Sequence, residues 1–389
     1  MAQTAQIWLL VNASLIGIII VPAIVVWFLT LGLARKRGDP ARVSFTWLKA
    51  CHPFFVLSLI LMVISDVAAV ILTSWQYSTG SYDTINHSDD AIRGLSQTYT
   101  YSGQIGVFFE RIVNALFVIV FAELGNGFRY AQTKKPPPYR NAVRIAAFAA
   151  AVIIFALSVA YFALPLAANV QYYQSRSSDD YVAIVVAGAK ARRLRAAGDA
   201  INFVVSVAQV VFAVLVARQH AGLPGRKSVT LYLVATILDL VRWVVLIVLL
   251  GAWIMPASED IPDAWNVVDP LFDTWIRFII LVLLLVVGNR RQDGVWSTIQ
   301  HWMQGHQAAY PQQAVPPYGP VSNQPAYYQH QQQNPGWQYS LSGVSPAGAY
   351  NPHELPSQQV VRPEELDSSQ MQPVYAHHGA VEVPAEKTA

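Results

Sequence analysis

Ionisable residues inside long apolar stretches are the strongest candidates for chemistry in this 389-residue chain. On insertion scales, a charged side chain at the centre of a membrane helix costs about 2.5–3.5 kcal/mol, so such residues normally face the bundle interior and pair. We therefore expect a polar cluster within the membrane. Its expected members are Asp66, Glu110, Arg111, Asn114, Glu123, Asp239, Arg242 and Arg277.

The spacing of these residues predicts how they pair. Asp239 and Arg242 are three residues apart, and Asp273 and Arg277 are four apart, so each pair can share one helix face. With a rise of about 1.5 Å per residue, Asp66 comes out at a depth similar to that of Arg242 and Arg277. This predicts an ion pair between Asp66 and one of these two arginines.

The cluster has two interpretations. In the first, its members form hydrogen bonds and ion pairs between helices that fix helix order and rotation. In the second, they line a polar pocket at the middle of the membrane that binds a ligand or works as a proton-linked switch. The sequence leaves both open.

No constellation typical of an enzyme is present. The chain contains no His-Glu-x-x-His, Gly-x-Ser-x-Gly or Gly-x-Gly-x-x-Gly sequence, and Gly222–Ser228 is too short for a phosphate-binding loop. The single cysteine, Cys51, excludes an intrachain disulfide and any cysteine-based zinc or iron–sulfur site. We expect no catalytic, metal or cofactor site. The net charge of +3 is too balanced to favour a nucleic-acid partner.

The elements that must position the cluster are seven long apolar segments. The composition, with 54% hydrophobic and 13% charged residues, is far from that of soluble domains, about a quarter of whose residues are charged. A helix that crosses the bilayer needs about 20 apolar residues, and every segment fits this length. We predict an all-α membrane protein whose residues 1–291 form a seven-transmembrane helix bundle. The segments run approximately over 7–33, 54–75, 105–128, 145–166, 201–217, 230–254 and 271–289.

Orientation follows from the lysines and arginines of the loops. They gather after the first, third, fifth and seventh segments, which predicts an external N-terminus and a cytosolic C-terminus. The cytosolic loops are then 129–144 and 218–229. Asn86 begins an Asn-His-Ser sequon in a predicted outer loop and is a predicted glycosylation site.

Residues 180–197 depart from this charge rule. The apolar stretch Tyr181–Ala189 is followed by basic residues on the predicted outer side. Either the segment lies on the outer surface or extends the fifth helix outward, or it re-enters the membrane. The basic residues are Lys190, Arg192, Arg193 and Arg195.

Two different segments follow the seventh helix. Residues 292–306 place Val295, Trp296, Ile299, Trp302 and Met303 at helical spacing, which predicts an amphipathic helix at the inner membrane interface. Residues 307–389 are rich in Gln, Pro and Tyr and lack apolar periodicity. We expect them to form a disordered cytosolic tail.

The predicted arrangement resembles that of G-protein-coupled receptors. Asp66 falls where such receptors often carry an acid, and Arg129-Tyr130 matches the end of their Asp-Arg-Tyr motif, although Phe128 stands in place of its acid. The seventh segment has no lysine for a retinal Schiff base, which disfavours a microbial rhodopsin. With its Gln/Pro/Tyr-rich tail and a His-Glu-Leu-Pro element at 353–356, the chain is also similar to uncharacterised seven-helix membrane proteins of filamentous fungi.

These observations favour a non-enzymatic, receptor-like or sensor-like multi-pass protein of the plasma membrane or an endomembrane. Membrane lipids are its expected partners, and loops 129–144 and 218–229 together with the tail are its expected surface for a cytosolic signalling partner. One alternative is a transporter or lipid translocator that uses the midplane charges. Another is a structural membrane organiser without a ligand. A cavity open to one side would favour a receptor, and a sealed, fully paired core would favour an organiser.

Overall fold

The computed structural model describes residues 2–34, 38–78, 89–175, 178–221, 225–254, 265–290 and 294–298. All of them belong to one compact unit, Met1–Val315. Within these described ranges the structure is helical and contains no strand. The predicted glycosylation site Asn86 and the predicted tail 307–389 lie outside the described residues.

Seven spans in the described residues are long and apolar enough to cross a membrane, which confirms the predicted all-α fold with seven such helices. Four of them are single helices. The second begins with the 3-10 turn η1 (Pro40–Arg42) ahead of α2, and the sixth continues from α6 into the π-helical segment η3 (Leu250–Ile254). The seventh continues from α7 through the π-helical segment η4 into α8. The elements are α1 (Ala2–Leu33), α2 (Ser44–Ser78), α3 (Asp89–Thr133), α4 (Arg140–Ser175), α5 (Ser178–Gln219), α6 (Arg226–Leu249), α7 (Trp265–Asp269), η4 (Pro270–Trp275) and α8 (Ile276–Asn289).

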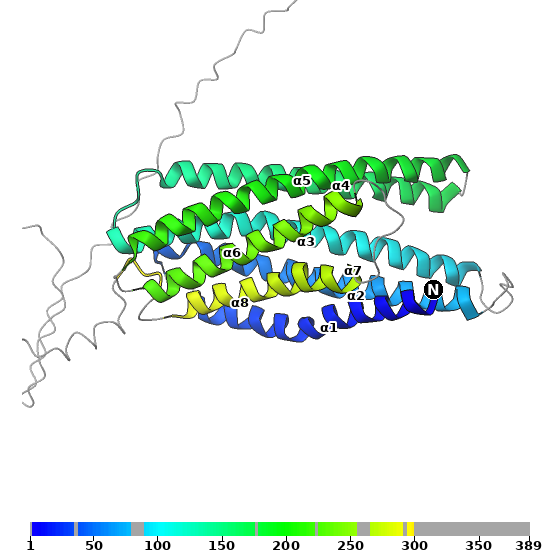
Figure 1. Cartoon of the computed structure of the whole chain (residues 1–389), viewed down its shortest axis with the longest axis horizontal. Coiled ribbons are helices and arrows are strands. Elements are labelled where there is room, and N and C mark those ends of the chain that lie inside the picture. The colour runs from blue at the N-terminus through cyan, green and yellow to red at the C-terminus, as the bar shows by residue number, and fades with distance from the viewer. Residues whose placement is uncertain are drawn as a thin grey trace, which may run out of the picture. The chain divides into compact units, whose positions relative to one another are not determined.

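Helices that follow one another in the chain pack against one another, and contacts between α1 and α8 close the bundle. Figure 1 shows the helices of this unit lying alongside one another. Helix α3 occupies the interior of the bundle and contacts α2, α4, α5 and α6. This central position explains why α3 carries four of the predicted cluster residues, since it offers a protein neighbour on most of its faces.

Several helices are longer than the membrane is thick. Helices α3 and α5 have 45 and 42 residues, or over about 60 Å of helix, whereas the hydrocarbon layer is about 30 Å thick. Helix α5 runs without a break from Ser178 to Gln219. Residues 180–197 therefore extend the fifth helix and do not form a re-entrant segment.

Large apolar side chains cover the outer faces of α1, α4 and α5. Val21, Ile145 and Val204 are each about two-thirds exposed, at 68%, 68% and 65%. Such a surface is unfavourable in water and favourable among lipid tails. The chain is therefore a multi-pass membrane protein that contacts lipids over these faces.

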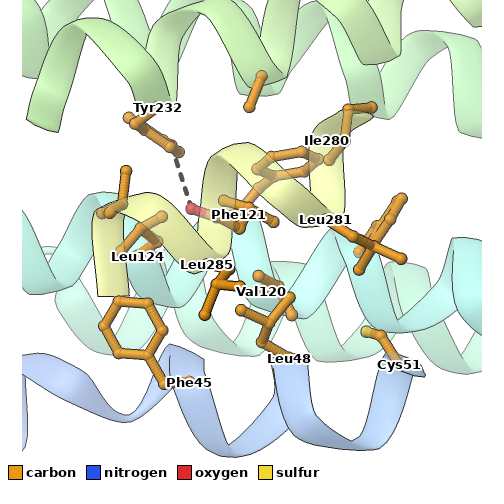
Figure 2. Packing of buried hydrophobic residues seen from close by; sticks show 14 of the residues in the cluster. Phe45, Leu48, Cys51, Val120, Phe121, Leu124, Tyr232, Ile280, Leu281 and Leu285 are labelled. Carbon is orange, nitrogen blue, oxygen red and sulfur yellow. Dashed lines mark hydrogen bonds between the residues drawn. The ribbon is translucent and has the colours of Figure 1, made fainter. Parts of the chain in front are cut away.

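A densely packed apolar layer joins α2, α3, α6 and α8 (Figure 2). The Tyr232 hydroxyl within it donates to the carbonyl oxygen of Phe121 at 3.1 Å, which satisfies its only polar group. Gly288 lets α8 approach closely, because a Cβ there would lie 2.8 Å from the Cβ of Ala34 and from Cε1 of Phe45. We call this set the apolar layer: Phe45, Leu48, Phe121, Leu124, Tyr232, Ile280, Leu281, Leu284 and Leu285.

Residues 294–298 differ from the amphipathic helix predicted over 292–306, because they form bends. Both carboxylate oxygens of Asp39 accept hydrogen bonds from Ser297 and Thr298, from their backbone N–H groups and their hydroxyls, at 2.5–3.1 Å. Val295 is fully buried, and the Trp296 ring lies 3.9 Å from the guanidinium carbon of Arg42. These contacts hold the segment against the α1–α2 connection. The remainder of 292–306 lies outside the described residues.

Candidate functional site

Three helices bring the predicted polar residues together. Glu110 and Asn114 come from α3, Asp239 and Arg242 from α6, and Arg277 from α8. Asp273 joins them from η4, where Pro270 supplies no backbone N–H and the chain widens into a π-helical turn. Wide turns of this kind frequently occur at functional sites. We call this set the charge network: Glu110, Asn114, Asp239, Arg242, Asp273 and Arg277.

Arg277 links α8 to α3 and to η4. Its Nη2 donates to Oε1 of Glu110 at 2.9 Å and to Oδ1 of Asp273 at 2.5 Å. Only 1% of Arg277 is exposed. The contact with Asp273 confirms the pair predicted from the four-residue spacing, and the contact with Glu110 is one that spacing within a helix could not show.

Arg242 links α6 to α3 and is fully buried. Its Nη2 donates to Oδ1 of Asn114 at 2.9 Å and lies 3.5 Å from Oδ1 of Asp239, the partner predicted on the same helix face. Its Nε lies 3.8 Å from Oδ1 of Asp273. Asp273 therefore lies within ion-pair distance of both buried arginines, and it couples α6 to the seventh span.

Hydrogen bonding in the charge network is incomplete. Nε and Nη1 of Arg242 and Nε of Arg277 are buried donors without a hydrogen-bond partner among the described residues. The same holds for Nδ2 of Asn114 and Oδ1 of Asp239. A buried donor that lacks its partner costs about 1–3 kcal/mol, and more when the group is charged. The network is thus costly to maintain, and it offers mostly donors to any acceptor that enters it.

Arg111 has its ion-pair partner outside the charge network, in Asp199 of α5. Asp199 is also 3.6 Å from Nε of Arg195, one turn earlier on the same helix. Asp199 is not among the residues predicted from the sequence, although its four-residue spacing from Arg195 is a signal that could have found it. Two arginines thus share one carboxylate between α3 and α5.

Asp66 does not pair with Arg242 or Arg277, so that prediction is wrong. Its Oδ2 accepts a hydrogen bond from Nδ2 of Asn12 on α1 at 2.8 Å. The physical reason is helix rotation: the charge network is built by α3, α6 and the seventh span, whereas Asp66 packs towards α1. Similar depth in the membrane did not predict this pairing, because depth does not show which way a side chain faces around the helix axis.

Glu123 also lies apart from the charge network. It is buried, and its Oε1 is 2.9 Å from Nε of Arg144, a residue of the predicted cytosolic loop 129–144. The cluster of eight residues predicted from sequence therefore divides: five belong to the charge network, and Asp66, Arg111 and Glu123 each have separate partners.

Two further polar groups near the predicted cytosolic end were missed. Arg42 is one of the basic residues that follow the first apolar segment, yet it is fully buried and its Nη2 donates to the carbonyl oxygen of Gly288. Asp39 is buried, which by itself raises the pKa of its carboxyl, but the hydrogen bonds from Ser297, Ala41 and Thr298 hold that pKa below its usual value. No pattern within one helix could reveal these contacts, because they join residues over 200 positions apart.

The apolar layer lies on one side of the charge network. Phe121 follows Glu110 on α3 by eleven residues, about 16 Å along the helix, and Leu281–Leu285 follow Arg277 on α8. Tyr232 precedes Asp239 on α6, which runs in the opposite direction. The layer is therefore displaced towards the predicted cytosolic side. Figure 2 shows its side chains meeting between the helices.

Comparisons with known proteins add no relative to these observations. No family model, no curated protein and no solved structure matches the chain.

Proposed function

We propose that the chain is a non-enzymatic, receptor-like membrane protein in which a small polar ligand enters the charge network and changes the packing of α3, α6 and α8. The observation that carries this proposal is the pair of buried arginines, Arg242 and Arg277, with donor atoms that lack hydrogen-bond partners among the described residues. A fully paired network would suit a structural organiser. A partly satisfied one is costly, which favours a binding role.

The two sides of the charge network differ in a way that supports a receptor over a transporter. Glu110 is its least buried charged member, with 17% of its side chain exposed, and it lies towards the predicted outer side. Towards the cytosol, the apolar layer follows directly. A transporter must open its site to each side of the membrane in turn, and the apolar layer covers the cytosolic side of the charge network in the described bundle.

The predicted cytosolic loops provide a surface for a partner. Nε of Arg129 donates to Oε1 of Gln219 at 2.7 Å, and Nε2 of Gln132 donates to the backbone carbonyl of Gln219 at 3.3 Å. Loops 129–144 and 218–229 thus meet at the ends of α3 and α5. A shift of α6, which begins at Arg226 beside this junction, would change the shape of the surface.

A distance measurement between α3 and α6 tests the proposal. Replacement of the only cysteine by Cys51→Ala allows spin labels at Gln132→Cys and Lys227→Cys in the full chain, reconstituted in lipid nanodiscs. Asp273→Asn removes the carboxylate that faces both buried arginines, so we expect electron paramagnetic resonance to show a shifted or broader label distance. The matched control Asp90→Asn, an exposed residue at the start of α3, should leave the distance unchanged.

A second measurement addresses the signalling role itself. Proximity labelling from the C-terminus should recover different sets of cytosolic proteins for the parent and for Asp273→Asn. Equal label distances, or the same protein set for both chains, would contradict a receptor-like role.

A further inference from the structure

A second site lies apart from the charge network, between α3, α4 and α5. The pocket there has a volume of about 280 Å³, close to the lower end of the usual range for small-molecule sites. Phe162 and Pro165 of α4 and Val107 of α3 form an apolar wall. Arg192 and Arg195 of α5 also line it, so apolar and cationic groups face the same space.

The charges at this pocket do not balance. Asp199 is shared between Arg111 and Arg195, so this group carries one positive charge in excess. Among the described residues, no carboxylate lies within ion-pair distance of Arg192. The two arginines of the pocket lining, Arg192 and Arg195, therefore give it an excess of positive charge, which attracts an anion.

Two polar atoms of residues that line the pocket make no hydrogen bond within the described part of the chain. Nε of Arg195 is a buried donor that lies 3.6 Å from Oδ2 of Asp199, beyond hydrogen-bond distance, and Oε1 of Gln104 is a buried acceptor. A phosphate or carboxylate supplies acceptors for the guanidinium groups, and a hydroxyl supplies a donor for Gln104. The headgroup of an anionic lipid combines these groups.

The depth of the pocket fits a lipid headgroup. Arg192 and Arg195 precede Gln219, at the opposite end of α5, by 27 and 24 residues, which is about 36–40 Å along the helix. A bilayer including its headgroups is about 40–45 Å thick. The exposed apolar side chains Phe155 and Val159 of α4 extend from the pocket towards the hydrocarbon layer.

We propose that the α3–α4–α5 pocket binds an anionic amphiphile, with its phosphate between Arg192 and Arg195 and its alkyl chain along Phe162. A phospholipid of the surrounding membrane is the source that the depth favours. This binding explains why basic residues gather in 190–195, on the side where the charge rule expects few. The site stands independently of the receptor-like function, because it shares no residue with the charge network.

The test uses the purified full chain in detergent, titrated with short-chain phosphatidic acid and followed by native mass spectrometry. Arg192→Gln should weaken apparent affinity about tenfold, since it removes a charge-assisted hydrogen bond. The matched control Arg193→Gln removes the same charge from an exposed neighbour outside the pocket lining, and it should change affinity less than about twofold.

A second variant tests the cavity without changing charge. Gly188 lines the pocket, and a Cβ there meets no atom within 4 Å, so Gly188→Leu fills the space without a clash at Cβ. We expect it to abolish phosphatidic acid binding while the unfolding temperature in the absence of lipid stays unchanged.

Three outcomes would overturn the proposal. The first is an equal loss of binding in Arg192→Gln and Arg193→Gln, which would mean that the lipid is attracted by the positive surface and not bound in the pocket. The second is full binding by Gly188→Leu. The third is inorganic phosphate binding as tightly as phosphatidic acid, with the same dependence on Arg192, which would identify a soluble anion as the ligand.

Discussion

The charge network and the apolar layer occupy the same helices, α3, α6 and α8, yet they contribute to stability in different ways. In the apolar layer, contacts are non-directional, and Tyr232 has a partner for its hydroxyl. In the charge network, each contact depends on direction, and several buried atoms have no hydrogen-bond partner among the described residues. Lipid tails are as apolar as leucine, so helix packing in a membrane gains little from the hydrophobic effect. Polar contacts therefore contribute more to deciding which helices pack together and in what orientation.

The largest expected effect comes from breaking the charge network. Arg277→Leu leaves Glu110 and Asp273 buried without their common partner, which should cost about 3–5 kcal/mol of the free energy of unfolding. Unfolding of the purified chain by detergent titration measures this cost. The control Arg218→Leu removes an exposed arginine and should change stability by less than about 0.5 kcal/mol. Equal costs for the two variants would contradict a stabilising network.

A smaller effect is expected from the apolar layer. Leu284→Ala removes a side chain that is only 1% exposed. In the core of a soluble protein such a change costs about 2–5 kcal/mol of the free energy of unfolding. Part of that cost is the free energy of transferring the side chain from water, and this part is absent when the unfolded state stays in lipid. We expect about 1–2 kcal/mol in the same titration. Leu215→Ala, at a lipid-facing position, should cost close to nothing, and a cost for Leu284→Ala above that of Arg277→Leu would reverse the comparison.

The smallest expected effect is local. It concerns the contact of residues 294–298 with the α1–α2 connection, which lies outside both the charge network and the apolar layer. The pKa of Asp39 is lower in the folded chain than in the unfolded one, so its contribution to docking 294–298 is complete above the unfolded pKa. It is lost as the pH falls through the folded pKa, below about 4. Hydrogen exchange at Ser297 and Thr298 should accelerate in that range, while the apolar layer stays protected.

Asp39→Asn should produce the same local acceleration at neutral pH, because an amide cannot accept charge-assisted hydrogen bonds at both of its polar atoms. Replacement of Asp90, which is exposed on α3, by Asn serves as the control. Unchanged exchange in Asp39→Asn would show that Val295 and the Arg42–Trp296 contact hold the segment without Asp39.

The fold could be predicted from the sequence to a large extent. The seven spans are visible as apolar segments, because partition into lipid depends on local composition and length. The pair Asp273–Arg277 was also predictable, since residues four apart share one helix face. Residues 180–197 could not be assigned, because an apolar stretch with basic residues suits a surface helix, a helix extension and a re-entrant segment equally well.

Only part of the membership of the candidate site could be predicted from the sequence. Glu110, Asn114, Asp239, Arg242 and Arg277 do converge, but Asp66 turns to Asn12, and Arg111 to Asp199. The helix predicted over 292–306 is absent from the described part of that range, 294–298, for a related reason. Asp39 accepts hydrogen bonds from the backbone N–H groups that a helix would use.

The sequence by itself determined that the chain is an all-helical membrane protein and that its buried charges must find partners, because both follow from the cost of leaving polar groups in hydrocarbon. Only the tertiary structure decided which partners they find. Pairing between helices depends on the rotation of each helix and on its neighbours, and these are set by packing across the whole bundle.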